Sequence, residues 1–301
     1  MEFSGWLNAM PGAVVQGLIW GIMAIGVYLT YKVLDVADLT VDGSMVTGMA
    51  VCAMLMVAGW NVWAAMLVAM LVGMCCGLVT GLFHTVMGIP AILSGILTQL
   101  MLWSVNLKIM GKANQALPAR TYEVLISQMS RYRALVILFL FCVVIIALLY
   151  WFFGTRYGAA VRATGNNEKM ARAQGINTSA IKVVGLALSN GMVALAGALL
   201  AQYKGSADIN DGRGAIVIGL AAVIIGEVLV SKFPQNFVVR LLGVVLGGIV
   251  YYIVYQTVVF LGLDTDLLKL LSAVVVAIFL AVPYFKTRYF SKQTPKHKEV
   301  S

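Results

Sequence analysis

Few residues of this chain have both the type and the setting for chemistry, and the most conspicuous is a single acid. Glu227 stands in the run GLAAVIIGEVLV, among glycine and aliphatic residues. A carboxylate in hydrocarbon is costly, so Glu227 must face protein or water and find a partner. Lys232, five residues on, is the expected partner through snorkelling and ion pairing. The alternative is a proton relay, which needs several titratable groups along one path, and the sequence does not line them up.

The longest polar interruption of the chain is residues 156–182, RYGAAVRATGNNEKMARAQGINTSAIK. Its only acid is Glu168, and its basic residues are Arg156, Arg162, Lys169, Arg172 and Lys182. The middle of the segment predicts a short helix that Asn166 or Asn167 caps at the start. Gly175 is placed to close this helix in the left-handed conformation. A short capped helix between two spanning helices is a shape that a partner protein can grip.

A third polar cluster, ADLTVDGSMVTG at 37–48, precedes an apolar run. Asp38 or Asp42 is placed to cap a helix start, where acids are favoured by the helix dipole. Alternatively, the helix is broken at this point and its exposed end lines a solute path. The residues alone leave these two interpretations even.

Motifs for catalysis and for nucleotide binding are missing from the sequence. It contains no GxxxxGK[ST] phosphate loop, no HExxH and no GxSxG. His84 and His297 have no carboxylate or cysteine neighbour at ligand spacing, so neither predicts a metal site. The four cysteines lie inside apolar segments and are interpreted as packing residues. We therefore expect no catalytic residue, metal or cofactor in this chain.

The composition predicts a membrane protein. Of 301 residues, 61% are hydrophobic and only 11% are charged, and the mean hydropathy is +0.93. A soluble domain needs far more polar surface. The net charge of +9 comes without a basic stripe that has interleaved aromatics, so nucleic acid is not an expected partner. The basic residues stand in short loops, where they orient a polytopic protein in lipid.

Apolar runs of about 20 residues, the length that crosses hydrocarbon, recur along the chain. The candidate spans are 12–31, 42–59, 62–83, 89–107, 134–153, 183–203, 214–231, 236–261 and 266–284. We therefore expect an all-α, polytopic helical bundle of about eight or nine spans, in a single domain over residues 1–301. The run 89–107 starts at a Gly-Ile-Pro sequence and carries several polar residues, so it is the candidate for a broken or re-entrant helix.

Lysine and arginine in short loops predict the orientation. The loop 154–182 and the basic tail 285–301 should both face the cytoplasm, and the even number of spans between them agrees. Counting back puts the N-terminus outside, and with it the loop 108–133, although that loop is also basic. Either the fourth run does not cross, or this loop is a basic outer surface for an acidic partner. We favour the second interpretation.

Glycines at four-residue spacing recur in the apolar runs, so that they share one helix face and let two backbones approach closely. They are Gly17 and Gly21, then Gly73, Gly77 and Gly81, then Gly243 and Gly247. We favour packing within the chain over a subunit interface, because that is the commonest use of this spacing.

Several long segments resemble a known family. They are ADLTVDGS (37–44), GIPAILSGILT (88–98), NLKIMGKAN (106–114), RATGNNEKMARAQGIN (162–177), LALSNGMVALAGALLAQY (186–203) and GLAAVIIGE (219–227). Through them, most of the chain resembles the permease subunits of bacterial ATP-binding-cassette importers. It is similar to the group of branched-chain amino acid, ribose and nucleoside permeases, and within it to a branch of tryptophan and tyrosine transport permeases.

The resemblance implies a helical permease of the bacterial cell membrane that pairs with a second copy of itself. Two cytoplasmic ATPase subunits, which bind ATP and Mg, would drive it, and an extracellular binding protein would deliver the solute. The stretch from 166 to 176 matches the coupling helix that sits in a groove of the ATPase in such importers. Its implied contact residues are Asn166, Asn167, Glu168, Lys169, Met170, Arg172 and Gly175.

Further roles follow for polar and aromatic residues on irregular segments. The candidates for the translocation path are Ser44, Ser94, Gln99, Trp103, Asn106, Ser189 and Asn190. The candidates for docking an acidic binding protein are Arg120, Arg131 and Arg133. Aromatic amino acids are the implied solute, with branched-chain amino acids, nucleosides and sugars left open. The alternative function is an ion- or proton-coupled carrier that acts without an ATPase.

Overall fold

The computed structural model describes residues 3–118, 121–233 and 236–260, and the isolated positions 270, 273, 274, 277 and 281. The expected ninth span and the basic tail lie outside these residues, apart from those positions. The helices are α1 (Phe3–Tyr28), α2 (Val41–Val57), α3 (Val62–Thr85), α4 (Ala91–Met110), α5 (Arg131–Gly154), α6 (Arg156–Asn166), α7 (Glu168–Ala173), α8 (Thr178–Lys204), α9 (Ala215–Val230) and α10 (Phe237–Phe260). A π-helical turn η1 (Leu29–Val33) extends α1, and a 3-10 turn η2 (Gln128–Ser130) precedes α5.

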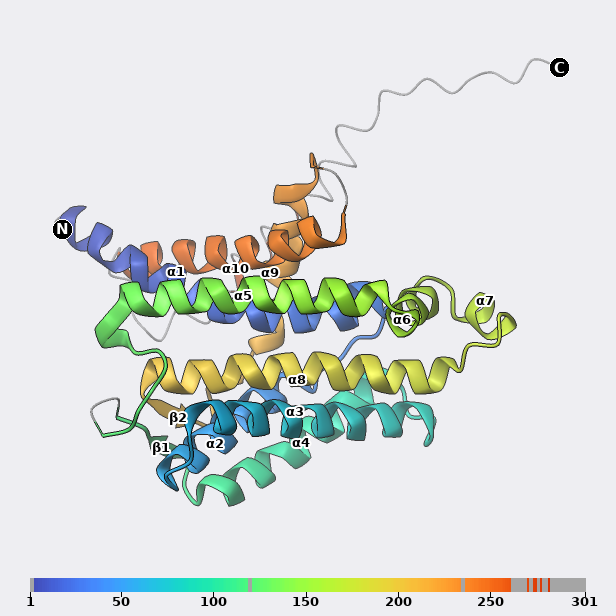
Figure 1. Ribbon diagram of the computed structural model, residues 1–301, viewed down its shortest axis with the longest axis horizontal. Coiled ribbons are helices and arrows are strands. Elements are labelled where there is room, and N and C mark those ends of the chain that lie inside the picture. The colour runs from blue at the N-terminus through green and yellow to red at the C-terminus, as the bar shows by residue number, and fades with distance from the viewer. Residues whose placement is uncertain are drawn as a thin grey trace, which may run out of the picture.

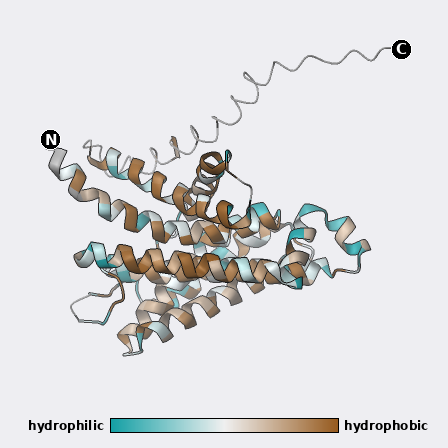
Figure 2. Cartoon of the chain, turned by 45° about the horizontal axis from the view of Figure 1, so that its top comes forward, coloured by the Kyte–Doolittle hydropathy of each residue, from teal (hydrophilic) through white to brown (hydrophobic). Residues whose placement is uncertain are grey.

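The long helices form one bundle with two different ends (Figure 1). Helices α1, α3, α5, α8 and α10 run side by side, and the short helices α6 and α7 project at one end. A two-stranded antiparallel sheet lies at the other end, where β1 (Asn114–Ala116) pairs with β2 (Ser206–Asp208). We call these the α7 end and the sheet end. Figure 2 shows hydrophobic residues along the middle of the long helices and hydrophilic ones gathered at the α7 end.

The predicted fold class, a polytopic helical membrane bundle, is confirmed. Among the described residues, six helices are long and apolar enough to cross a membrane, and α2 and α9 are shorter apolar helices. Each of the first eight expected spans contains one of these helices. The helices differ in how much of each is buried: 78% of the most apolar stretch of α8 is buried in the chain, against 28% of that of α5. Helix α8 is therefore central, and α5 offers most of its surface to its surroundings.

The prediction that the run 89–107 is broken is wrong, because α4 is continuous from Ala91 to Met110. Pro90 stands immediately before the first turn, where its missing N–H group costs the helix nothing. Gly111, with a φ of 67°, ends the helix in the left-handed conformation. Because α4 runs the full length, the two basic loops 108–133 and 154–182 lie at opposite ends of the bundle, as the count of spans predicted.

The helices that begin inside the bundle are instead α2 and α9. Helix α2 begins beside the middle of α8, where Ser44 Oγ donates to Asn190 Oδ1 at 2.5 Å. Helix α9 begins at the same depth, because the backbone N–H groups of Gly214 and Ile216 donate to Asp42 on α2. The chain therefore re-enters the bundle twice: residues 34–40 enter from the α7 end, and residues 209–214 enter from the sheet end.

The glycine stripes pack helices of this chain against one another, as predicted. A Cβ atom on Gly77 of α3 would overlap the Leu186 carbonyl of α8. Gly17 of α1 lies against Ile249 of α10 in the same way. Gly247 of α10 faces the Ala222 carbonyl of α9. These close approaches bring backbones into contact, which is the main source of helix association where lipid removes the hydrophobic drive.

Gly77→Ala should lower the free energy of unfolding by about 1–3 kcal/mol, because the added methyl group overpacks the α3–α8 contact. Gly154→Ala is the matched control, since a Cβ at Gly154 meets no atom within 4 Å. Thermal unfolding of the purified chain in detergent measures both. Equal unfolding temperatures for the two variants would contradict the close contact.

Candidate functional site

Two helices, not one, make up the projecting arm at the α7 end. Helix α6 was missed by the sequence analysis; its signal is Thr155, whose hydroxyl accepts from the Gly158 N–H at 3.4 Å and caps the first turn. Gly165 of α6 lies against the Val33 carbonyl of η1, which no larger residue could approach so closely. Arg162 also donates to the Phe153 carbonyl at 2.8 Å. The arm is therefore fastened to the ends of α1 and α5.

The predicted short capped helix is confirmed as α7. The Asn167 side chain accepts from the Met170 N–H at 3.0 Å, so Asn167 is the cap, while Asn166 ends α6. At the other end, Gly175 takes a φ of 81° and its N–H donates to the Arg172 carbonyl at 2.9 Å. The next N–H, of Ile176, donates to the Ala171 carbonyl, which completes a Schellman motif.

Glu168 ties α7 to the first turns of α8. Its carboxylate accepts from Lys182 at 2.8 Å, from Arg172 at 2.7 Å and from the Thr178 hydroxyl at 3.2 Å. Arg172 also donates to Thr178 at 2.8 Å, so the four side chains form one network. The hydrogen bond from Lys182 is the main reason why the pKa of Glu168 lies below its ordinary value; burial opposes it, and the charge of Arg172 adds to it.

Part of α7 is open to the surroundings. Lys169 is exposed, Arg172 is exposed although it also bonds Glu168 and Thr178, and the apolar side chain of Met170 is 48% exposed. Only Ala171 of this helix is buried. The predicted coupling residues therefore divide by role: some shape and fasten the helix, and others offer a cationic and apolar surface. A displacement of α7 by a bound partner would reach α8 through the Glu168–Lys182 hydrogen bond.

The centre of the bundle holds a buried network of polar side chains. Asp38 accepts from Asn190 Nδ2 at 2.6 Å and from the Thr40 N–H at 2.9 Å. The Thr40 and Thr80 hydroxyls share a hydrogen bond of 2.7 Å, and Thr80 donates to Thr98 at 2.9 Å. All five residues are at most 2% exposed. The network joins α2, α3, α4 and α8 at the depth where α2 begins.

Four of the predicted path residues lie in or beside this network. Ser44 and Asn190 bond each other, and the Ser94 carbonyl accepts from Thr98 at 3.0 Å. Ser189 instead donates to the Gly26 carbonyl of α1 at 2.7 Å. All four are fully buried. In this conformation they hold helices together and do not line an open cavity.

The other three predicted path residues, Gln99, Trp103 and Asn106, line one small cavity of about 30 Å³. Arg213, which the sequence analysis missed, joins them with its guanidinium 4.6 Å from the centre of the Trp103 ring. Asn106 Oδ1 is buried and has no hydrogen-bond partner among the described residues. The cavity thus combines a cation, an aromatic face and an unused acceptor with the carboxylate of Asp42, which also lines it. The only signal for Arg213 was its place as one of two basic residues, with Lys204, between two apolar runs.

The sequence suggested that Asp42 caps its own helix, and the structure shows that it does not. The N-cap of α2 is Thr40, and Asp42 accepts instead from the Gly214 N–H at 3.0 Å and the Ile216 N–H at 2.9 Å. It therefore caps α9 from another helix, because the N-cap residue Gly214 has no side chain for this purpose. The negative charge also suits the positive end of the α9 dipole.

The partner of Glu227 is Lys32 of η1 at 3.0 Å, and the prediction of Lys232 is wrong. Lys232 lies beyond the end of α9, whereas η1 brings Lys32 alongside Glu227. The pair is part-exposed, with 35% of the Glu227 side chain and 44% of the Lys32 side chain accessible. Glu227 therefore lies near the α7 end and is charge-compensated.

Of the predicted docking arginines, Arg131 and Arg133 begin α5 at the sheet end and are exposed. Arg120 lies outside the described residues.

Two short helices, α2 with 17 residues and α9 with 16, meet inside a membrane bundle that also carries a capped arm at one end. Discontinuous helices of this kind occur at the solute sites of transporters. Residues 10–282 match the model of a family described as "Branched-chain amino acid transport system / permease component". The chain belongs to this family. It is therefore a permease subunit of an ATP-driven importer of the ATP-binding-cassette class, a class that works with ATPase and binding-protein partners and whose permease subunits are not themselves catalytic.

Relatives agree with this assignment. The chain is 38% identical over 276 residues to the tyrosine transport system permease protein of Clostridioides difficile (strain R20291), with 91% of each chain covered. It is 31% identical over 278 residues to an uncharacterised protein of Rickettsia prowazekii (strain Madrid E), covering 91% of this chain and 98% of the other. An autoinducer 2 import system permease protein of Escherichia coli O9:H4 (strain HS) is 27% identical over 216 residues, or 69% of this chain and 60% of that one. No solved structure matches the chain.

The attachment of α7 should depend on pH through Glu168. Because its folded pKa is lowered from an ordinary value near 4.5, the ion pairs stabilise the arm above that value. The stabilisation should disappear as the pH falls through the lowered folded pKa. Hydrogen-exchange protection of residues 166–176, corrected for the intrinsic rate and followed from neutral to acidic pH, measures this loss.

Glu168→Gln should reduce the protection at neutral pH and flatten its pH dependence. Glu123→Gln, at the sheet end, is the matched control and should leave both unchanged. A pH profile in Glu168→Gln that equals the wild-type profile would contradict the role of this carboxylate.

Proposed function

We propose that this chain forms the translocation path for aromatic amino acids, with tyrosine as the leading candidate. The observation that carries the proposal is the cavity of Trp103, Asn106 and Arg213, taken together with the 38% identity to a tyrosine transport permease. A zwitterionic aromatic solute needs a cation for its carboxylate, an acceptor for its ammonium group and a flat apolar surface for its ring. Arg213, Asn106 Oδ1 and Trp103 supply these three groups.

The depth of Arg213 supports the same role. It precedes α9, whose first turn lies at the level of the buried network in mid-bundle, and its side chain is exposed. A charge at membrane depth faces a protein interior or a water-filled passage, because hydrocarbon excludes it. The exposed side of Arg213 and of α4 would then face a passage between this chain and a second copy. The cavity of about 30 Å³ is too small for an amino acid, so the solute would enter when the two copies move apart.

In this proposal, the arm at the α7 end transmits the conformational change of the ATPase subunits to the spanning helices. In this proposal Lys169, Met170 and Arg172 contact a cytoplasmic ATPase subunit, and Glu168 carries the movement to α8. Helix α8 bonds α2 through Asn190, at the place where α9 also begins. A rigid displacement of α8 would therefore change the packing around α2 and α9. ATP binding to the ATPase would shift the equilibrium between two arrangements of these helices.

The proposed orientation follows from the same arm. The α7 end faces the cytoplasm and the N-terminus lies outside, so that Arg131 and Arg133 lie on the outer face. There they are placed to meet acidic residues of the binding protein. Two copies of this chain with two ATPase subunits form the proposed assembly.

The test of coupling is the double variant Lys169→Ala/Met170→Ala in the whole importer. It should release the co-purifying ATPase and lower uptake by at least about tenfold, since both residues are exposed and would lie in the proposed contact. The unfolding temperature of the chain should not change. Arg156→Ala/Tyr157→Ala removes a matched pair of exposed basic and aromatic residues from α6 and should retain the ATPase.

Loss of the ATPase from both double variants would contradict a specific role of α7. Uptake that persists after ATP depletion, while an ion gradient remains, would instead favour the carrier without an ATPase.

The test of the path is Arg213→Gln. Uptake of radiolabelled tyrosine by the whole importer should fall by at least about tenfold, because the carboxylate of the solute loses its charge-assisted hydrogen bond from Arg213. ATPase co-purification should persist, which separates this effect from loss of coupling. Lys108→Gln is the control, as Lys108 is an exposed cation at the end of α4 that does not line the cavity. Wild-type uptake in Arg213→Gln would overturn the proposed site.

A further inference from the structure

A second and much larger cavity lies at the α7 end, between η1, α6 and the start of α10. Its volume is about 610 Å³ and it is open to the surface. Its charged lining residues are Lys32, Arg162, Arg240 and Asp35, and Tyr28 and Phe237 are among its aromatic ones. The translocation path proposed above does not use this cavity.

The charges of this cavity favour an anion. Three cations face a single lining carboxylate, and Lys32 is neutralised by Glu227 at 3.0 Å. Arg162 uses one nitrogen on the Phe153 carbonyl and keeps the rest of its donors. The Arg240 guanidinium lies against the Tyr28 side chain, and its Nε atom is buried and finds no acceptor in the part of the chain that the structure describes. Two planar guanidinium groups with unused donors match the oxygens of a phosphate.

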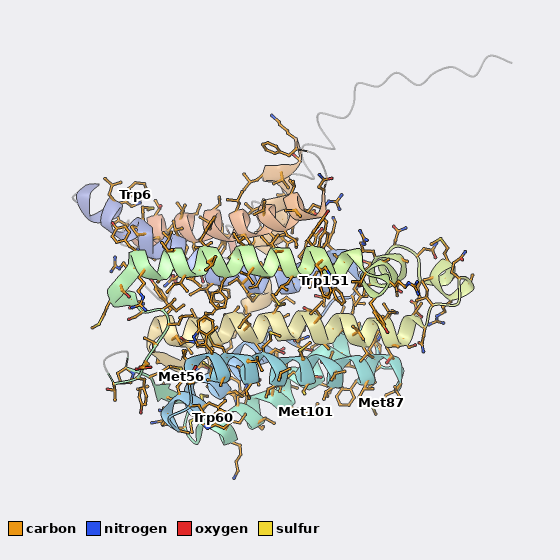
Figure 3. The ribbon with its side chains drawn as sticks, viewed as in Figure 1. Trp6, Met56, Trp60, Met87, Met101 and Trp151 are labelled. Atoms are coloured by element: carbon orange, nitrogen blue, oxygen red, sulfur yellow. The ribbon has the colours of Figure 1, made fainter. Side chains whose placement is uncertain are left out.

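An apolar groove continues from the basic cavity. A cavity of about 510 Å³ shares Arg162 and Phe237 with it and is also lined by Tyr150, Trp151 and Phe153. Figure 3 shows Trp151 toward the α7 end of α5, and its side chain is 71% exposed. The outer face of α5 adds a row of exposed apolar residues, namely Phe139, Leu140, Val143, Val144 and Leu148. Aromatic residues in this position are typical of the level of lipid headgroups.

We propose that this continuous surface binds one anionic phospholipid. Its headgroup phosphate lies between Arg162 and Arg240, and an acyl chain follows the aromatic groove between α5 and α10. Basic pockets between spanning helices at one membrane face bind such headgroups. Because Arg162 belongs to α6, the bound lipid also fastens the arm that carries α7. The inference rests on the membrane fold alone and does not depend on which solute is transported.

The test uses the purified, delipidated full chain and thermal unfolding. Short-chain phosphatidylglycerol should raise the unfolding temperature, whereas phosphatidylcholine with the same acyl chains should not. Inorganic phosphate is the third probe, because it carries the anion without the acyl chains. An equal shift by inorganic phosphate would overturn the lipid proposal in favour of a free-anion site, and equal shifts by the two lipids would overturn the charge selectivity.

Variants locate the site. Arg162→Gln and Arg240→Gln should each weaken phosphatidylglycerol binding by at least about tenfold, the effect of one lost charge-assisted hydrogen bond. Arg156→Gln, an exposed cation on the same helix as Arg162, should bind like the wild type. Should a variant fail to fold, native mass spectrometry of the wild-type chain decides, since phosphatidylglycerol must be retained in preference to phosphatidylcholine. Equal retention, or unchanged binding in both arginine variants, would refute the site.

Discussion

The fold depends on the requirement that backbone polar groups inside a bilayer be satisfied by the protein itself. Two helices, α2 and α9, begin in the middle of the bundle, and side chains of other segments accept from N–H groups at their starts. Asp42 of α2 accepts from two N–H groups at the start of α9, and Asp38 accepts from the Thr40 N–H at the start of α2. Asn190 of α8 then bonds both Asp38 and Ser44. These carboxylates therefore stabilise the starts of both short helices at this depth.

The central position of α8 follows from this joint. Glycines of α3 let its backbone approach that of α8, and Asn190 fixes α8 to the start of α2. At its other end, α8 carries Lys182, which holds Glu168 of the arm. Helix α8 thus connects an exposed surface at the α7 end with the place where α2 and α9 begin. In the proposed importer this continuity would carry a movement of the arm to the middle of the bundle, through packing that has discrete arrangements.

Much of the architecture could be predicted from the sequence. Apolar runs located the helices, and the cap residue Asn167 with Gly175 defined α7 almost to the residue, because caps are local signals. The same reasoning failed where the partner lies far along the chain. Glu227 pairs with Lys32 and not with Lys232, and Asp42 caps α9 and not its own helix. Arg213 was missed because a basic residue in a short segment says nothing about which helix it will face.

The sequence by itself therefore determined the membrane setting, the helical spans, the short capped helix and the family, since each depends on local composition, local spacing or long ordered matches. Only the tertiary structure decided that the discontinuities fall at α2 and α9 and that α4 is continuous. It also decided which path candidates are buried as structural ties and which share a cavity with Arg213. These outcomes depend on the depth at which each helix starts, and that depth is set by hydrogen bonds between residues 146 to 174 positions apart in the chain.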